Sequence, residues 1–183
     1  KAFSYFRRLN EDSGKAGNFD SLNYRQKTKE VKQLFAEPAK LSTGKPTDKV
    51  PIFVLGMSRS GKTLVESLLA QSPEVFAAGE LHDWREAVET VATRHGITGE
   101  FPAYTSHLVE QHLHEIAGFY MKKIIALSPQ SRFFVNTMPG YFAYIGLIFQ
   151  CLPAARVIHC TRDALDNGLY MYFKQYRHGH DYS

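Results

Sequence analysis

The fold is decided by residues 51–70, which read PIFVLGMSRSGKTLVESLLA. The short apolar run of residues 52–55 ends at Gly56, as a buried central strand does. A helix is expected over residues 63–70, and the side chains expected to face the sheet are Leu64, Leu68 and Leu69. A glycine-bearing loop joins the two. This order of strand, loop and helix is the context in which phosphate-binding loops occur.

The loop from Gly56 to Thr63 offers the groups that bind phosphate. Glycines permit a tight turn, successive backbone N–H groups form a nest for an anion, and the helix N-terminus adds partial positive charge. Read literally, the string is GxxxxGKT, the Walker A pattern, in which Lys62 contacts the β/γ-phosphates of a nucleotide and Thr63 holds Mg²⁺. An ATP-dependent kinase or NTPase is therefore one hypothesis.

A Walker loop also needs a carboxylate at the end of a neighbouring strand to position Mg²⁺. The strands expected over residues 133–136 and 157–161 end at Asn136 and Thr161, and neither residue is acidic. Asp163 follows two residues later, where it is better explained as a residue of the first helical turn. The NTPase hypothesis is weakened by this pattern and stays open.

The sequence from residue 49 onward alternates strand and helix signals, which predicts a parallel sheet covered by helices. Further helices are expected over residues 81–94, 106–127, 141–151 and from Asp163 to about residue 176. The predicted fold class is a P-loop-like three-layer α-β-α domain, incomplete at its C-terminus, over residues 49–183. Cys151 and Cys160 are expected to be reduced core residues, and no metal site is expected.

Residues 1–48 are expected to form a helical N-terminal segment with linkers. Residues 1–10 are predicted to end an amphipathic helix whose partner core lies upstream of Lys1, and residues 11–19 to be a linker. A second helix is expected over residues 21–37, with the inward side chains Leu22, Val31, Leu34 and Phe35. Residues 38–48 form the expected domain boundary. The chain stops at Ser183 directly after an aromatic run, so we expect a domain that is cut short.

Composition narrows the function classes. A chain with 44% hydrophobic and 22% charged residues is typical of a globular protein and excludes disorder, collagen and disulfide scaffolds. The net charge of +4 comes from residues 1–50, with 11 basic and 6 acidic side chains, because residues 51–183 hold 11 and 12. The basic excess lies outside the predicted site, so no nucleic acid partner is expected. The longest apolar stretch, residues 141–153, is too short to cross a bilayer.

Two ordered blocks of the sequence resemble a known family. Residues 51–81, from PIFVLGMSRSGKTL to AAGEL, resemble the opening of sulfotransferases related to tyrosylprotein sulfotransferases, especially those that follow tetratricopeptide repeats. The loop of that family reads GMPRSGTTL and is followed by AGEL. Residues 132–176 resemble the family's DKMP turn, helix and 3′-phosphate segment, typically RDPxDxxLSxYF. Residues 1–10 resemble the last helix of a tetratricopeptide repeat.

The resemblance implies transfer of a sulfuryl group from 3′-phosphoadenosine 5′-phosphosulfate (PAPS) to an acceptor hydroxyl, a reaction of the EC 2.8.2 type that needs no metal. Glu80 falls on the family's catalytic base, and Arg59 and Lys62 supply positive charge for the transfer. The residues expected to hold the 5′-phosphosulfate are Arg59, Ser60, Gly61, Lys62, Thr63 and Leu64. Those expected at the 3′-phosphate are Arg162, Tyr170 and Lys174, the last two on one helix face.

Five positions depart from the family pattern. A loop threonine is Lys62 here, the DKMP lysine is Thr137, the serine at the 3′-phosphate is Tyr170, and Ser58 and Ala164 replace prolines. We interpret Lys62 as a relocated cation that replaces the missing lysine at position 137. The hydroxyl of Tyr170 lies further from the backbone than that of serine, so Tyr170 either displaces the phosphate or points elsewhere.

The acceptor class stays open, because protein tyrosine, carbohydrate and small phenols all offer a hydroxyl. A third hypothesis is a catalytically degenerate domain that acts as an interaction module. The expected location is the cytoplasm, or the Golgi lumen for a true tyrosylprotein sulfotransferase with an N-terminal anchor. The sequence makes no prediction of oligomeric state.

Overall fold

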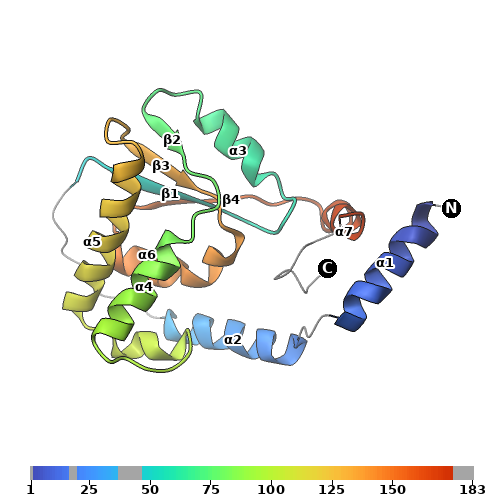
Figure 1. Cartoon of the computed structure of the whole chain (residues 1–183), viewed down its shortest axis with the longest axis horizontal. Coiled ribbons are helices and arrows are strands. Elements are labelled where there is room, and N and C mark those ends of the chain that lie inside the picture. Colours follow the sequence, from blue (N-terminus) through green and yellow to red (C-terminus); the bar gives the residue numbers. More distant parts are fainter. Residues whose placement is uncertain (1, 17–19, 37–46, 175–183) are drawn as a thin grey trace.

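The computed structural model describes residues 2–16, 20–36 and 47–174, and Figure 1 shows a central sheet with helices on both faces. Within these residues the sheet has four parallel strands in the order β2-β3-β1-β4, namely β1 (Val50–Leu55), β2 (Val75–Ala77), β3 (Phe133–Asn136) and β4 (Arg156–His159). In register, Val50 pairs with Phe133 and Ile52 with Arg156. The predicted α/β fold class with a parallel sheet is confirmed.

The sheet lies between two layers of helices because the side chains of β1 alternate between its faces. Phe53 and Leu55 are buried in the larger core together with Trp84. The helices on that face are α4 (Asp83–Arg94), α5 (Glu110–Leu127) and α6 (Ile145–Cys151). Ile52 and Val54 are buried on the other face, which α3 (Lys62–Leu69) covers. The remaining helical elements are α1 (Ala2–Ala16), α2 (Ser21–Leu34), the 3-10 helices η1 (Ala103–His107) and η2 (Pro139–Tyr144), and α7 (Ala164–Tyr172).

Helix α3 turns a different face to the sheet than predicted. Leu64 and Leu68 are 65% and 64% exposed, whereas Lys62 and Glu66 are buried. Lys62 and Glu66 are four residues apart and therefore share one side of the helix. The prediction of Leu64 and Leu68 as inward residues was wrong because the loop fixes the rotation of α3 through Lys62, described below.

Helix α1 extends through residues 11–16, which the sequence had predicted as linker. Its aromatic residues lie against α7, since the ring of Phe6 is 4.9 Å from that of Phe173 and the ring of Phe3 stacks on Tyr172 at 5.2 Å. Asn10 also donates a hydrogen bond to the backbone carbonyl of Tyr172. Within the described residues α1 therefore packs on the segment that follows β4, a contact that the sequence did not predict. A partner upstream of Lys1 stays a prediction.

Helix α2 carries no buried residue, and Leu22, predicted to face inward, is 76% exposed. Its attachment is Phe35, directly after the helix, which packs against the larger core. A Cβ atom at Gly146 would overlap the Phe35 ring, so the glycine gives the ring its place on α6. Most of the predicted boundary, residues 38–46, lies outside the described residues, and the division at residues 48 and 49 stays a prediction.

Candidate functional site

Four loops meet at one edge of the sheet because parallel strands all end on the same side. These loops follow the four strands at residues 56–61, 78–82, 137–138 and 160–163. They are joined by backbone bonds: Thr137 N–H donates to the Gly79 carbonyl over 2.9 Å, and Cys160 N–H donates to Leu55 over 2.7 Å. Residues from distant parts of the sequence therefore converge on the phosphate-binding loop.

The loop between β1 and α3 adopts left-handed backbone at three positions. Gly56, Arg59 and Gly61 have φ values of 147°, 67° and 101°, and Gly61 caps the N-terminus of α3. The cap has no side-chain hydrogen bond, which leaves the first N–H groups of the helix available to an anion. A Cβ atom at Gly56 would overlap the carbonyl oxygen of Cys160, so this position requires glycine.

Replacing Gly56 by alanine should destabilise the protein by about 2–4 kcal/mol, because the change adds both backbone strain and overlap with the β4 loop. Thermal unfolding measures this as a drop in Tm of several degrees. Gly140→Ala is the matched control, since a Cβ atom there meets nothing within 4 Å. Equal Tm values for the two variants would contradict the packing of the loop against Cys160.

Lys62 is buried, only 6% exposed, and its ammonium lies inside the loop. Nζ donates to the carbonyls of Gly56 at 3.2 Å and Met57 at 2.9 Å. Burial lowers the pKa of Lys62, while the nearby Glu80 carboxylate acts in the opposite direction. An ammonium has three N–H donors, so one remains for an anion bound in the nest.

Two arginines stand beside the loop and share one aromatic ring. The guanidinium carbon of Arg59 is 4.9 Å from the ring centroid of Tyr170, and that of Arg162 is 5.1 Å from the same centroid. Arg162 also donates to the backbone carbonyl of Arg59 over 3.4 Å. Arg59 and Arg162, which the sequence predicted at one nucleotide site, thus lie close together, and the sequence did not predict that Tyr170 links them.

A cavity of about 310 Å³ opens between the loop and α7. Its lining includes Ser60, Arg162 and Asn167. Ser60 Oγ and Asn167 Oδ1 are buried without a hydrogen-bond partner among the described residues, while Asn167 Nδ2 donates to the Ser58 carbonyl. Unpaired buried polar atoms cost free energy, so a polar ligand in this cavity would be stabilised by pairing with them.

Glu80 follows β2 on the other side of the loop and is exposed. Its backbone neighbour Gly79 is held by Glu66, whose buried Oε1 accepts the Gly79 N–H at 2.8 Å. Glu66 projects from α3, the helix whose N-terminus forms the loop. Glu66 therefore ties the Glu80 segment to the phosphate loop. The sequence reading missed Glu66, although its spacing of four residues from Lys62 was a usable signal.

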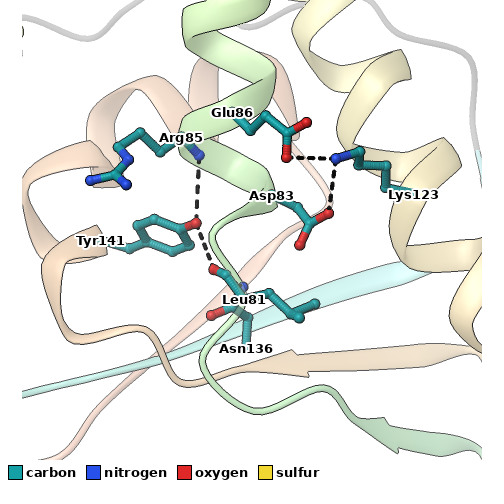
Figure 2. Close-up of polar contacts among 7 residues, drawn as sticks. All are labelled: Leu81, Asp83, Arg85, Glu86, Lys123, Asn136 and Tyr141. Carbon is teal, nitrogen blue, oxygen red and sulfur yellow. Dashed lines mark hydrogen bonds and ion pairs between the residues drawn. The ribbon is translucent and has the colours of Figure 1, made fainter.

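Buried polar groups also fix the residues after Glu80 (Figure 2). The Tyr141 hydroxyl donates to the Leu81 carbonyl at 2.6 Å and accepts from the Arg85 N–H at 3.5 Å. Asn136, at the end of β3, donates to the same Leu81 carbonyl. Burial raises the pKa of Tyr141 to about 12, so the hydroxyl keeps its proton at neutral pH. The backbone on both sides of Glu80 is therefore held, at Gly79 and at Leu81.

The same close-up shows a surface ion cluster on α4. Lys123 of α5 lies 2.6 Å from a Glu86 oxygen and 3.4 Å from an Asp83 oxygen, and the hydrogen bond with Glu86 raises the pKa of Lys123. This cluster fastens α5 to the first turn of α4. Its contribution is small, because exposed ion pairs stabilise by about 0–1 kcal/mol.

The other predicted site residues are less enclosed. Thr63 and Leu64 lie in the first turn of α3 with exposed side chains, and Lys174 is exposed just beyond the end of α7. Their contacts with a nucleotide stay predictions. The strands on either side of β1 end at Asn136 and His159, neither of which offers a carboxylate. Within residues 2–16, 20–36 and 47–174, no three His, Cys, Asp or Glu side chains are grouped as a metal would need.

Two further findings concern the cysteines and the helices. Both cysteines, Cys151 and Cys160, are buried and free, as the sequence predicted. Among the helices of the described segments, none combines the length and apolar character needed to span a membrane.

Comparison with known proteins agrees with this geometry. A protein of Aquifex aeolicus (strain VF5), described only as an uncharacterized protein, is 32% identical over 188 aligned residues, which cover 98% of this chain. The alignment takes in 25% of that relative, so the chain spans about a quarter of its length. The profile of the sulfotransferase family matches residues 51–183, which include all four strands of the described sheet except Val50 and all four loops at its edge. The chain therefore belongs to the sulfotransferase family.

Proposed function

We propose that this chain transfers a sulfuryl group from PAPS to the hydroxyl of an acceptor molecule. The proposal rests on the positive charge at the loop of this sulfotransferase family member. The buried Lys62 and the side chains of Arg59 and Arg162 lie around backbone N–H groups that can bind an anion. Ser60 and Asn167 line the adjoining cavity, and each has a buried polar atom without a hydrogen-bond partner among the described residues, which supports a polar ligand.

The loop residues 59–64 would hold the 5′-phosphosulfate through backbone N–H groups, Ser60 Oγ and the Lys62 ammonium. Arg162 is the proposed ligand of the 3′-phosphate, with Lys174 as an additional cation at the end of α7. PAPS, when bound, supplies the sulfuryl group and a bisphosphate leaving group. The positive charges of Arg59 and Lys62 stabilise the negative charge that develops on the leaving side.

Glu80 is the proposed base. Its carboxylate is exposed and so accessible to an acceptor, and its charge acts on Lys62, which places it next to the loop. A carboxylate in this position can take the proton of the attacking hydroxyl as the new bond forms. The acceptor would approach from the solvent side of residues 78–82.

The proposal extends to the branch of the family and to the compartment. A relationship to the tetratricopeptide-linked sulfotransferases is supported by the quoted motifs and by the helical form of residues 2–16. A cytoplasmic location is supported by the two free cysteines, because oxidising compartments favour disulfides.

Glu66 provides a test of how Glu80 is positioned. Glu66→Met leaves the Gly79 N–H without its acceptor, and we expect kcat to fall about tenfold because the base loses its alignment. Glu66→Gln keeps an oxygen acceptor and should stay within about threefold of the wild-type kcat. Steady-state kinetics of both variants measure this. The account fails if the methionine variant loses affinity for the sulfuryl donor while its kcat is unchanged.

The function itself is tested by incubating the protein with [³⁵S]PAPS and three acceptors: a tyrosine peptide, an oligosaccharide and a small phenol. The proposal expects label transfer to at least one acceptor, together with release of adenosine 3′,5′-bisphosphate. ATP·Mg²⁺ hydrolysis without any label transfer would instead support the literal Walker A reading. Inactivity with both nucleotides, in a protein that unfolds cooperatively, would support a degenerate interaction module.

A further inference from the structure

Resting on this proposed function, we propose that Tyr170 is a positioning residue that holds Arg59 and Arg162 for the sulfuryl donor through its ring face rather than its hydroxyl. The two guanidinium carbons lie at nearly equal distances, 4.9 and 5.1 Å, from one ring centroid. Arg59 comes from the loop after β1 and Arg162 from the loop after β4. Tyr170, on α7, is the side chain that both arginines contact.

Stacking on a ring suits an arginine that must also bind an anion. A guanidinium that stacks on a ring uses the face of its plane, whereas its N–H donors lie around the edge. Both arginines can therefore stay on Tyr170 and still offer donors to phosphate oxygens. Arg162 already uses one of its N–H donors in this way, in a hydrogen bond to the backbone carbonyl of Arg59.

Two neighbouring cations repel each other, and long side chains lose conformational freedom when they bind. A ring whose face attracts both cations offsets their repulsion. It also limits the conformational freedom of the two arginine side chains before the ligand binds. A serine at this position offers a hydroxyl but no such surface. The substitution of tyrosine for the family's serine is thus explained as a different way to organise the same two arginines.

The position of Tyr170 makes the idea testable without unfolding the protein. Tyr170 is 48% exposed, as is its neighbour Leu169. Tyr170→Ser should therefore change stability little, and Leu169→Ser is a matched control for the loss of a half-exposed apolar side chain from α7. Thermal unfolding of both variants establishes that each is folded.

The experiment measures binding of adenosine 3′,5′-bisphosphate by calorimetry to the wild type and to Tyr170→Phe, Tyr170→Ser and Leu169→Ser. We expect Tyr170→Ser to weaken binding about tenfold or more, and the conservative Tyr170→Phe to restore it to within about threefold of the wild type. Leu169→Ser should bind as the wild type does. Tyr170→Phe as weak as Tyr170→Ser would overturn the proposal, because the hydroxyl would then be the active group.

A double-mutant cycle separates positioning from a general structural effect. In an Arg59→Ala, Arg162→Ala background the added Tyr170→Ser change should have almost no effect, since the ring acts through these side chains. The same tenfold loss in that background would overturn the proposal. A wild-type protein that does not bind the bisphosphate overturns the proposed function and this inference with it, whereas wild-type binding with an unaffected Tyr170→Ser overturns the inference alone.

Discussion

Replacing Lys62 by threonine, the residue of the family's loop, is expected to lower kcat/KM for sulfuryl transfer about 100- to 1000-fold. The reason is that the substitution removes the positive charge of Lys62 from the loop. Position 137, where the family has a lysine, is a buried threonine that is 3% exposed and lies at the loop junction, so it supplies no cation. Lys62 is the buried cation of the loop, held by the Gly56 and Met57 carbonyls. Steady-state kinetics with PAPS measure the effect.

Restoring a positive charge at another position, residue 137, controls for damage to the loop. Thr137→Lys in the Lys62→Thr background restores the family arrangement, and we expect it to recover at least about tenfold of the lost kcat/KM. Thermal unfolding checks that both variants are folded. Full activity of Lys62→Thr alone would contradict the idea that the charge has moved from position 137 to position 62.

Glu80→Gln is expected to lower kcat about 100- to 10,000-fold, because an amide cannot accept the proton of the acceptor hydroxyl. Binding of adenosine 3′,5′-bisphosphate should change less than twofold, since in the proposed function Glu80 contacts the acceptor and not the nucleotide. The combination of a large kcat effect with unchanged nucleotide affinity is the signature of a base. Single-turnover kinetics and calorimetry measure the two quantities.

Glu74→Gln is the matched control for the loss of a carboxylate. Glu74 is exposed and lies directly before β2, whereas Glu80 follows the same strand at the site edge. We expect the control to keep the wild-type kcat. A Glu80→Gln variant with the same kcat as Glu74→Gln would remove Glu80 from the mechanism and leave the identity of the base unknown.

The parts of the fold that were predictable are those fixed by local pattern. The strand over residues 133–136 and the helix around Trp84 follow from apolar runs and helical periodicity. β2 was missed because three residues, Val75–Ala77, are too few to show an alternation. The prediction of the inward face of α3 was wrong because a hydrophobic pattern selects Leu64 and Leu68, whereas the buried residues of the helix include the charged Lys62 and Glu66.

The residues of the candidate site also differ in whether a local sequence pattern predicts them. The loop of residues 56–63, Glu80 and Arg162 stand in contiguous motifs, so the sequence alone could propose them as site residues, and their roles stay predictions. Glu66 contacts Gly79, 13 residues away, and the ring of Tyr170 contacts Arg162 and Arg59, 8 and 111 residues away. The spacing of Glu66 from Lys62 marks a shared helix face, but the contacts with Gly79 and Arg59 depend on how parallel strands bring loops to one edge.

The loop from Gly56 to Thr63 reads as Walker A, yet we propose that it forms the donor site of a sulfotransferase. Calorimetry of the protein with adenosine 3′,5′-bisphosphate in the presence of EDTA, set against ATP with and without Mg²⁺, tests it most directly. The account predicts that the bisphosphate binds in EDTA and binds more tightly than ATP under either condition. Binding of ATP only with Mg²⁺, without binding of the bisphosphate, would contradict it.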